Sequence, residues 1–584
     1  MSEESAAQKG AGLVRPAKNR PFELRGLGKA FAGGKFIVSG GKEVFAAQPS
    51  EEPCSTHEDL VWKCTALFNE GRCQMKTWIV VSFAALSFLA AGGASAQTCP
   101  LNGTLSTKLV CQIPQVYGPF GFGTTTDPTQ SVLFTGDHHN AHFSSDFLST
   151  FAPINEAVGI QASQLPIASP SSGITFVYDP ALKTFSPSTD ESLGPIVGNR
   201  ATTIGRRKLF LGFSYQYFNF GSIDGQNLSN IPTVLQHQPF PVPNPQHIPS
   251  CDNQTGLTAA NGYAGDPCFV RDFIQTANNI DLTIHQYTIY ATYGITNRLD
   301  FSVAIPILNI QMGVTSQATI VPNSAAPVAA GAPGNVWHSF NPTNPVLATQ
   351  CASQVPCLSA KFSDSGSAAG IGDVVLRGKY TVYNGERFAV AAGVDVRLPT
   401  GDALNFLGSG ATGVKPFGVV SYRARISPHA EVGYEWNGDS TLAGTNIVPA
   451  AAGVTPTNTG KLPNRFVYIV GADVRVVKRL TAAFDIYGQR LFNSPELVSQ
   501  PYTGLGNCSG PTDPTGATCG TYTAGTTHPD IAQRTSDVNI TEASLGLKYR
   551  LVGRLVITGN VLLKLDEGGL RSNAVPLVGI SYNF

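Results

Sequence analysis

From residue 208 onward, apolar and polar residues alternate with a period of two, the pattern of strands whose two faces meet different surroundings. The clearest run places Val432, Tyr434 and Trp436 on one face and Glu431 and Glu435 on the other. A strand that crosses a bilayer as part of a barrel shows this alternation, because one face meets lipid and the other meets the lumen. The pattern therefore predicts strands with one apolar face.

Counting these runs predicts twelve strands, most of them with the ~9–11 residues or more that a tilted strand needs to cross a bilayer. In the second strand the apolar positions change phase, which predicts a bulge near Gln286. The expected ranges are 208–220, 279–294, 299–313, 370–383, 388–398, 414–426, 429–437, 465–477, 480–492, 539–551, 555–565 and 574–584.

The connections between these strands alternate in length. Short turns at one end and long loops at the other are the plan of bacterial outer-membrane barrels. The sequence therefore predicts an all-β fold, a transmembrane antiparallel β-barrel of about 12 strands, with a range of roughly 12–14. Short turns are expected at 296–298, 384–386, 427–428, 478–479 and 552–553, and long loops near 221–278, 314–369, 399–413, 438–464, 493–538 and 566–573.

A secretory signal peptide is predicted inside the sequence. Met75 and Lys76 precede an apolar stretch from Trp78 to Ala91, and the small residues Ala94-Ser95-Ala96 then form a cleavage site. The apolar stretch is shorter than the ~20 residues of a membrane-spanning helix. A buried helix is the alternative interpretation of this stretch.

These features divide the chain into four parts. Residues 1–74 are interpreted as a mis-called or disordered extension, with Met75 as the true start, and a cytoplasmic extension is the alternative. The signal peptide is 75–96. Residues 97–207, rich in Ser, Thr, Pro and Gly, are expected to be a plug inside the barrel or a periplasmic segment. The barrel is 208–584.

The composition agrees with export to a membrane. Charged residues are 13% of the chain, about half the ~25% usual for a soluble protein. The formal net charge is zero, so bulk charge gives no reason to expect nucleic-acid binding. The expected location is the cell outer membrane of a Gram-negative bacterium.

The end of the chain carries a second targeting signal. Val578, Ile580, Tyr582 and the terminal Phe584 lie on one phase of the last predicted strand. An alternating last strand that ends in an aromatic residue resembles the sorting signal read by the barrel-assembly machinery. That machinery and outer-membrane lipid are therefore expected partners.

The cysteines fall on both sides of the predicted signal peptide. Three of the 11 precede it, and the other eight form four close pairs, as expected for disulfides formed in an oxidising compartment. Zinc binding is the alternative, but none of the pairs has CxxC spacing. Three pairs fall in the predicted long loops. The pairs are Cys99 with Cys111, Cys251 with Cys268, Cys351 with Cys357, and Cys508 with Cys519.

Charged residues on the polar phase of the strands are expected to line the lumen, because a basic residue facing lipid costs ~2–4 kcal/mol near the midplane. Their mixed signs favour cross-strand ion pairs over a solute path for most of them. The set is Asp300, Asp373, Arg377, Lys379, Asp395, Arg397, Arg423, Arg425, Glu431, Glu435, Asp473, Arg475, Asp485, Lys548, Arg550 and, with a weaker pattern, Lys564.

Two short motifs resemble binding sites. The run from Gly408 to Gly413 matches G-x-G-x-x-G, but the expected strand after it, in place of a helix, favours a loop over a nucleotide site. His138, His139 and His142 could bind a transition metal if they lie on a helix, but solvated histidines are the favoured interpretation. The sequence predicts no metal and no cofactor.

Three stretches resemble a known outer-membrane family, the one named for the MetA pathway of phenol degradation. They are Gly370–Tyr380, Phe388–Asp402 and Tyr293–Pro306. The resemblance covers roughly residues 200–584, and the family is distantly grouped with the fatty-acid channel barrels. It implies an outer-membrane barrel that admits small hydrophobic or aromatic compounds.

The preferred functional hypothesis is a channel, not an enzyme, for passive uptake of small and hydrophobic or aromatic solutes. The first alternative is a structural or surface-binding barrel without an open pore. The second is a hydrolase embedded in the barrel, although no Ser/His/acid arrangement is evident in the sequence.

The signal peptide gives the first testable prediction. Because the apolar stretch ends in Ala94-Ser95-Ala96, cleavage should follow Ala96. N-terminal sequencing of the protein purified from outer membranes should begin at Gln97. A membrane-inserted protein that still carries residues 1–74 would contradict this prediction.

Overall fold

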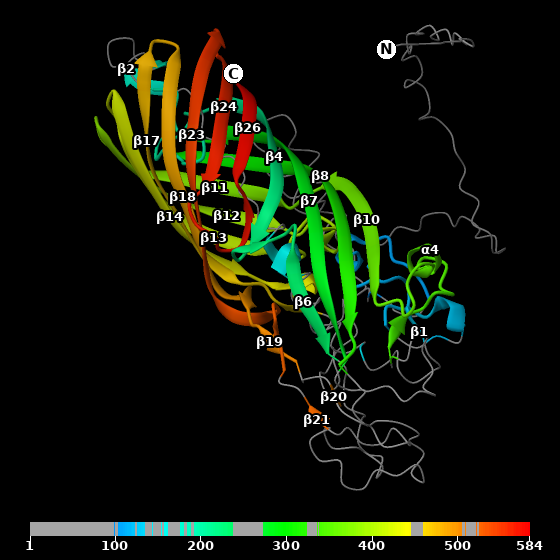
Figure 1. Cartoon of the computed structure of the whole chain (residues 1–584). Helices are drawn as coiled ribbons and strands as arrows, with labels where there is room; N and C mark the ends of the chain where they lie inside the picture. Colours follow the sequence, from blue (N-terminus) through cyan, green and yellow to red (C-terminus); the bar gives the residue numbers. More distant parts are fainter. Residues whose placement is uncertain are drawn as a thin grey trace, which may run out of the picture. The chain divides into compact units, whose positions relative to one another are not determined.

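The computed structural model describes most of the chain from residue 99 onward (Figure 1). The main described ranges are 103–122, 127–134, 192–236, 272–323, 338–444, 459–504 and 525–584, with shorter pieces among them at 99, 125, 143, 154, 157–161, 176–179, 184–187, 336, 508–509 and 521–522. The predicted signal peptide, the cluster of three histidines and the pair Cys251 and Cys268 lie outside the described residues.

Twelve antiparallel strands form one closed barrel, so the predicted fold class is confirmed. The first strand, β4, pairs with the last, β26, and with β7, and this closes the ring. The twelve are β4 (Leu209–Ile223), β7 (Phe273–Gly294), β8 (Leu299–Val321), β11 (Val374–Asn384), β12 (Phe388–Leu398), β13 (Gly413–Tyr422), β14 (Ile426–Asn437), β17 (Asn464–Val477), β18 (Leu480–Ser499), β23 (Ile531–Val552), β24 (Leu555–Lys564) and β26 (Ala574–Asn583).

Figure 1 shows opposite walls of the barrel crossing at a large angle, with β11 to β14 behind β23, β24 and β26. Strands tilted against the barrel axis produce this crossing. Successive strands are joined by short turns at one end, here called the short-turn end. At the other end, the long-loop end, the connections are longer and carry smaller elements. The predicted alternation of connections is therefore confirmed, but the turn expected at 427–428 is wrong, because β14 begins at Ile426 and the turn is formed by residues 423–425.

The smaller strands and helices lie in the connections and before β4. The strands are β1 (Leu133–Phe134), β2 (Phe176–Asp179), β3 (Thr184–Pro187), β5 (Gln226–Asn227), β6 (Ile231–Gln236), β9 (Ser339–Phe340), β10 (Ser359–Ile371), β15 (Asp439–Ser440), β16 (Gly460–Lys461), β19 (Tyr502–Thr503), β20 (Cys508–Ser509), β21 (Thr521–Tyr522), β22 (Thr527–His528) and β25 (Leu570–Ser572). The helices are η1 (Leu109–Cys111), η2 (Pro128–Gln130), α4 (Ala348–Cys351), η5 (Ala403–Asn405) and η6 (Thr441–Ala443).

The bulge predicted near Gln286 is wrong. β7 pairs with β4 and with β8 through this region without a shift of register. Ile284, Gln286 and Thr288 all point inward and are buried, whereas Tyr287 and Ile289 are exposed on the outer face. The hydrophobic pattern changes phase because the apolar side of the strand changes from the inner face to the outer face along its length.

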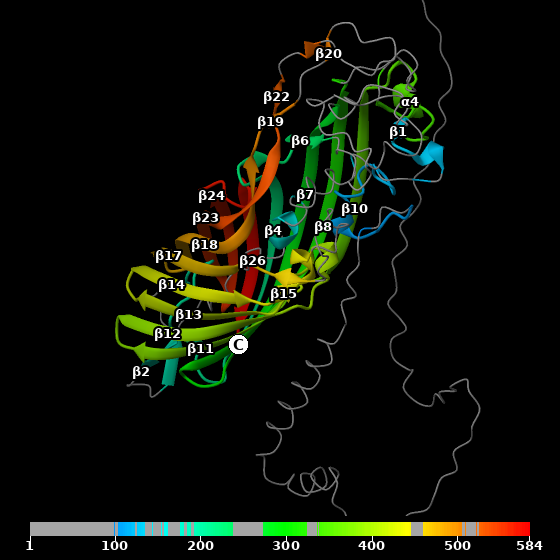
Figure 2. The same cartoon turned by 90° about the horizontal axis from the view of Figure 1, so that it is seen from below.

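The predicted loop 314–369 is partly wrong as well, because strands continue into it (Figure 2). β8 extends to Val321, and β10 pairs with it along its whole length. β10 and β11 follow the same edge of β8 and are separated only at Gly372 and Asp373. The outer faces of these extensions carry Gln311, Gln317 and Lys361, so the alternation of apolar residues that marks a lipid-facing strand is lost there.

The outer surface of the barrel carries an apolar band between two groups of aromatic residues, as membrane barrels do. The exposed residues of the band include Leu211, Phe213, Ile289, Ile307, Val394, Val420, Val432, Val470, Phe484, Leu545, Ile557, Val578 and Ile580. Exposed aromatic residues near the short-turn end are Tyr293, Tyr380, Tyr383, Phe388, Tyr422, Tyr549, Tyr582 and Phe584, and Trp436 and Phe466 lie nearer the long-loop end.

The largest hydrophobic core lies inside the long-loop end. It combines inward residues of β7, β8 and β10 with residues that precede the barrel, among them Leu109, Ile113, Val116 and Tyr117. The Tyr117 hydroxyl also forms a hydrogen bond of 2.7 Å with Ser316 Oγ on β8. Part of the N-terminal segment therefore packs against the inner face of the wall.

In the described part of the chain, no helix has the length and the apolar character needed to cross a membrane.

The facing of β14 gives the second prediction. Val432 is 51% exposed on the outer face, whereas its neighbour Glu431 is 2% exposed and faces the lumen. Val432→Arg should destabilise the folded barrel by ~2–4 kcal/mol, the cost of a basic residue facing lipid near the midplane. Glu431→Gln keeps an acceptor oxygen and should have a small effect. Electrophoresis of unboiled samples measures the folded fraction, and equal tolerance of both changes would contradict the facing.

Candidate functional site in the barrel lumen

A segment that directly precedes β4, residues 192–204, lies inside the short-turn half of the barrel and is hydrogen-bonded to inward side chains of many strands. Leu193 N–H donates to Thr481, Ala201 N–H to Ser421, and Ile204 N–H to Asp300. These acceptors belong to β18, β13 and β8, on different sides of the barrel. We call residues 192–204 the inner segment.

Two lysines of the wall hold carbonyl groups of the inner segment. Lys379 Nζ donates to the carbonyl oxygens of Arg200 and Thr202 at 3.0 and 2.9 Å. Lys548 Nζ donates to the carbonyl oxygen of Pro195 at 2.6 Å. Both ammonium groups are buried, so these hydrogen bonds replace the hydration that each group would have in water.

Charged pairs add to this attachment. Arg200 forms an ion pair of 2.7 Å with Asp473 and also contacts Ser192, which is itself hydrogen-bonded to Asp473. The amide of Asn199 donates to Glu431 at 2.6 Å and its oxygen accepts from Arg377 at 2.9 Å. Hydrogen bonds to charged groups typically contribute about 1.5–3 kcal/mol each.

The inner segment also passes very close to the wall. The N–H groups of Val197 and Gly198 both point at Asp485 Oδ2, and His429 Nε2 lies 2.7 Å from the other oxygen of Asp485. A Cβ atom on Gly198 would lie 2.5 Å from His429 Nε2, and one on Gly294 would lie 1.8 Å from the carbonyl oxygen of Gly205. A side chain at Gly294 would overlap the backbone of Gly205, and one at Gly198 would overlap the buried ring of His429.

Of the charges expected in the lumen, eleven are buried or nearly so: Asp300, Asp373, Arg377, Lys379, Asp395, Arg397, Glu431, Glu435, Asp473, Asp485 and Lys548. Arg423 lies at the short-turn end, where it donates to the carbonyl oxygen of Gly385 at 2.6 Å and to Asn384. Arg425 is exposed in the turn before β14, and Arg475, Arg550 and Lys564 are partly exposed.

One set of these charges forms a chain along the wall nearer the long loops. Arg397 contacts Asp373 at 3.4 Å and Glu435 at 3.1 Å. Arg465 then contacts Glu435 at 2.7 Å and donates to Gln489 at 2.9 Å. A second set joins Asp395 to Arg377 and Lys415 at 2.6 and 3.1 Å. Opposite charges on nearby strands thus alternate around one side of the lumen.

The other side of the lumen is apolar over part of its length, although Gln286 and Thr288 of β7 also point inward. The inward residues of β7 and β8 include Leu282, Ile284, Ile310 and Met312, and Phe218 on β4 continues this surface. A charged wall therefore faces an apolar wall across the lumen, and part of the apolar wall is covered by the N-terminal residues of the core.

Side chains at the long-loop end hold the connections in place. Asp224, in the turn between β4 and β5, accepts hydrogen bonds from Leu497 N–H at 3.0 Å and Gly569 N–H at 2.7 Å. Burial raises the pKa of the Asp224 carboxyl to about 6, although these two donors act in the opposite direction. The turn of β4 is thereby tied to β18 and to the connection between β24 and β26.

Two of the four expected cysteine pairs are within the described side chains, and both are disulfides. Cys99 is bonded to Cys111, and Cys351 is bonded to Cys357. The side chains of Cys508 and Cys519 lie outside the described residues. Both observed disulfides are buried in the core at the long-loop end.

Of the two motifs that resemble binding sites, only the glycine-rich run lies in the described chain. The run from Gly408 to Gly413 is a loop followed by β13, and its Ser409 donates to Asp373. The three clustered histidines lie outside the described residues, and within those residues no group of three or more His, Cys, Asp or Glu is arranged to hold a metal ion.

Several lumen residues were not among the candidates from the sequence. Lys415 and Glu542 lie on the polar phase of their strands, so the alternation alone could have identified them. Arg465 lies at the start of β17 and was obscured by the preceding long loop. Arg571 lies in a connection expected to be a plain loop, and it is almost completely buried inside the barrel.

Comparison with protein families supports the resemblance seen in the sequence. Residues 264–464 match the family model described as "Putative MetA-pathway of phenol degradation". This confirms the resemblance over β7 to β14, the connections between these strands, and the connection from β14 to the start of β17. No match is found among curated proteins.

Three solved structures are similar over most of their own length. An outer-membrane channel from Pseudomonas putida F1 has 10% identity and a TM-score of 0.33, over 66% of this chain and 98% of that one. A Pseudomonas aeruginosa FadL homologue has 9% identity and a TM-score of 0.24, over 65% and 90%. The Ralstonia pickettii toluene transporter has 10% identity and a TM-score of 0.21, over 65% and 89%.

The attachment of the inner segment gives the third prediction. Asn199→Ala removes the hydrogen bonds to Glu431 and Arg377. Both charged groups keep an ion-pair partner in the variant, Lys415 for Glu431 and Asp395 for Arg377. Losing about 1.5–3 kcal/mol per bond should raise the population with a displaced segment at least roughly tenfold. Single-channel conductance in planar bilayers should show more frequent or larger openings.

The matched control for this change is Asn219→Ala, which alters the same residue type on the outer face of β4. Both variants should keep the mobility of a folded barrel on unboiled gels. Conductance of Asn199→Ala equal to that of the control would mean that the inner segment does not restrict the lumen.

Proposed function

We propose that the chain is an outer-membrane channel that lets small, hydrophobic or aromatic solutes enter by facilitated diffusion. The observation that carries the proposal is a closed barrel with a lipid-type outer surface and a lumen in which an apolar wall faces a charged wall. A solute with an apolar body and a polar group can contact both walls. The proposal assigns no catalytic step and no cofactor to the chain.

The family description and the solved structures suggest the class of solute. The matched family is described by a pathway of phenol degradation, and one of the similar structures is a toluene transporter. Both names refer to small aromatic compounds. We extend this class to the present chain as part of the proposal.

The proposal includes a route to the membrane. The signal peptide 75–96 directs export and is removed, and the last strand is recognised by the barrel-assembly machinery. Phe584 is exposed beside Tyr582, with ring centroids 4.7 Å apart, and its N–H donates to the carbonyl oxygen of Leu209 at the seam of the barrel. In this orientation the short turns are periplasmic, and the long loops with their disulfides face outward.

The proposal also gives the segment 97–207 a role as a plug. Its residues 192–204 occupy the periplasmic half of the lumen and are held by the hydrogen bonds described above. The same contacts favour the alternative function, a barrel without an open pore that binds a partner through its loops. The two functions differ in whether solute crosses the barrel.

Uptake by intact cells tests the proposal and gives the fourth prediction. Gram-negative cells that produce the protein should accumulate radiolabelled phenol and toluene faster than cells without it, at concentrations where the outer membrane limits entry. Cells that produce the misfolded Val432→Arg variant are the control for expression. Equal rates with and without the folded protein, together with no conductance in bilayers, would support the barrel without an open pore.

A further inference from the structure

A ring of basic side chains surrounds the short-turn end of the barrel. Every short turn between two strands carries at least one exposed arginine or lysine, and two more lie just before β4. Figure 2 shows two of these turns, between β11 and β12 and between β13 and β14, side by side at this end. We call the eight residues the basic rim: Arg206, Arg207, Arg298, Arg387, Arg425, Lys478, Arg479 and Arg554.

The basic rim has one sign of charge, although the chain as a whole has a formal net charge of zero. Among the described side chains, Glu386 is the only exposed acidic one at the short-turn end. Protein surfaces usually intersperse both signs, and a large field of one sign attracts a partner of the opposite charge. The other exposed acidic side chains of the described chain lie toward the long-loop end: Asp127, Asp281, Asp402, Asp439, Asp537 and Glu567.

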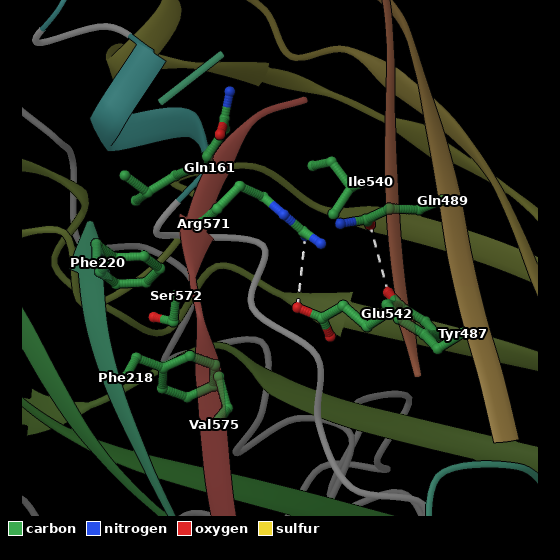
Figure 3. Close-up of a pocket in the computed structure, with 11 residues that line it drawn as sticks. Gln161, Phe218, Phe220, Tyr487, Gln489, Ile540, Glu542, Arg571, Ser572 and Val575 are labelled. Atoms are coloured by element: carbon green, nitrogen blue, oxygen red, sulfur yellow. Dashed lines mark hydrogen bonds and ion pairs between the residues drawn. The ribbon is translucent and has the colours of Figure 1, made fainter. Parts of the chain in front are cut away.

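The basic rim differs from the arginines inside the barrel in having no acidic partners. Inside, Arg377 pairs with Asp395 at 2.6 Å, and Arg571 lies 3.5 Å from Glu542 (Figure 3). None of the eight rim side chains forms an ion pair or a side-chain hydrogen bond within the described part of the chain. Their charges are therefore available to a partner outside the protein.

Large apolar side chains beside the basic rim indicate that this partner is a lipid. In each of the five short turns, an exposed apolar residue lies within three residues of a rim residue, and these apolar side chains are between 46% and 69% exposed. Their burial against acyl chains is favourable, whereas exposure to water is not. Arginine and lysine next to such residues extend their charged groups to the headgroup level. The apolar residues are Ile295, Phe388, Ile426, Val477 and Val552.

From this combination we propose that the basic rim is a binding surface for anionic phospholipids of the leaflet that faces the periplasm. Guanidinium and ammonium groups donate hydrogen bonds to the phosphate oxygens of the headgroups. An acidic soluble protein would satisfy the charges but would leave the apolar residues of the turns without contact. Successive turns are two strands apart, which is roughly 10 Å, so several lipids bind around the circumference.

The inference rests on the orientation given in the proposed function, with the short turns on the periplasmic side. It adds to that function a partner that holds the barrel at a fixed depth in the membrane. Phosphatidylglycerol keeps the negative charge of its phosphate, whereas phosphatidylethanolamine carries an ammonium group that cancels it. The basic rim should therefore distinguish between these two headgroups.

Native mass spectrometry of the purified full-length protein in detergent tests the inference and gives the fifth prediction. With equal amounts of phosphatidylglycerol and phosphatidylethanolamine, bound phosphatidylglycerol should predominate. Each basic residue near an anionic headgroup contributes a factor of about five to binding. The double variant Arg387→Gln with Arg479→Gln should therefore lose at least roughly tenfold of this preference. Its fold should be unaffected, because neither side chain has a partner in the described chain.

Two matched variants control for charge and for position. Arg387→Lys with Arg479→Lys keeps both charges and should keep most of the preference for phosphatidylglycerol. Lys361→Gln with Lys461→Gln removes two exposed charges near the long-loop end and should leave the preference unchanged. Unboiled gels should show a folded barrel for all three double variants.

The outcomes separate this inference from the proposed channel function. Equal binding of the two lipids, or the same preference in the rim variant and in the long-loop control, would overturn the inference, while solute uptake by cells would still support the channel. Detection on intact cells of an epitope inserted after Glu386 would place the basic rim outside, where lipopolysaccharide supplies the phosphates. That result would overturn both the lipid assigned here and the proposed orientation.

Discussion

The structure depends on one constraint: a charge inside a narrow barrel has no bulk water, so it must be paired within the barrel. The lumen of this protein meets the constraint in two ways. On the side of β11 to β18, arginines and carboxylates of the same or nearby strands pair with one another. Near the short-turn end, the partners come from the inner segment, whose carbonyl and N–H groups satisfy Lys379, Lys548, Asp300 and Asp485. The inner segment is thus part of how the wall itself is stabilised.

This arrangement divides two roles of the lumen, rigidity of the barrel and contact with a solute, between its two walls. The polar wall keeps the barrel rigid, because its charges are fixed by one another. The apolar wall of β4, β7 and β8 can contact a solute in more than one orientation, because apolar contact is not directional. Where the two walls meet, Arg571 lies 3.5 Å from Glu542 and 3.5 Å from Asp566. One guanidinium group thus serves two carboxylates at the boundary between the walls.

The sequence predicted the barrel well, because lipid and lumen impose opposite preferences on alternate residues. It was misleading where that contrast is absent. In β7 the apolar side moves from the inner to the outer face near Gln286, and a uniform strand was taken for a bulged one. β10 is rich in Ser, Ala and Gly and does not alternate between apolar and polar residues, so it gave no strand signal. Arg571 follows no period, and only the folding of its connection into the barrel places it in the lumen.

The position of the inner segment in the chain has a consequence for the order of assembly. Residues that precede β4 pack inside both ends of the barrel, from Tyr117 against β8 to Ile204 against Asp300. The ring closes only when β26, the last strand made, pairs with β4. Inward residues that already lie within the curve of the sheet when the seam forms need not be threaded through an open end of the closed ring. In this protein the residues that fill the barrel are synthesised before the strand that closes it.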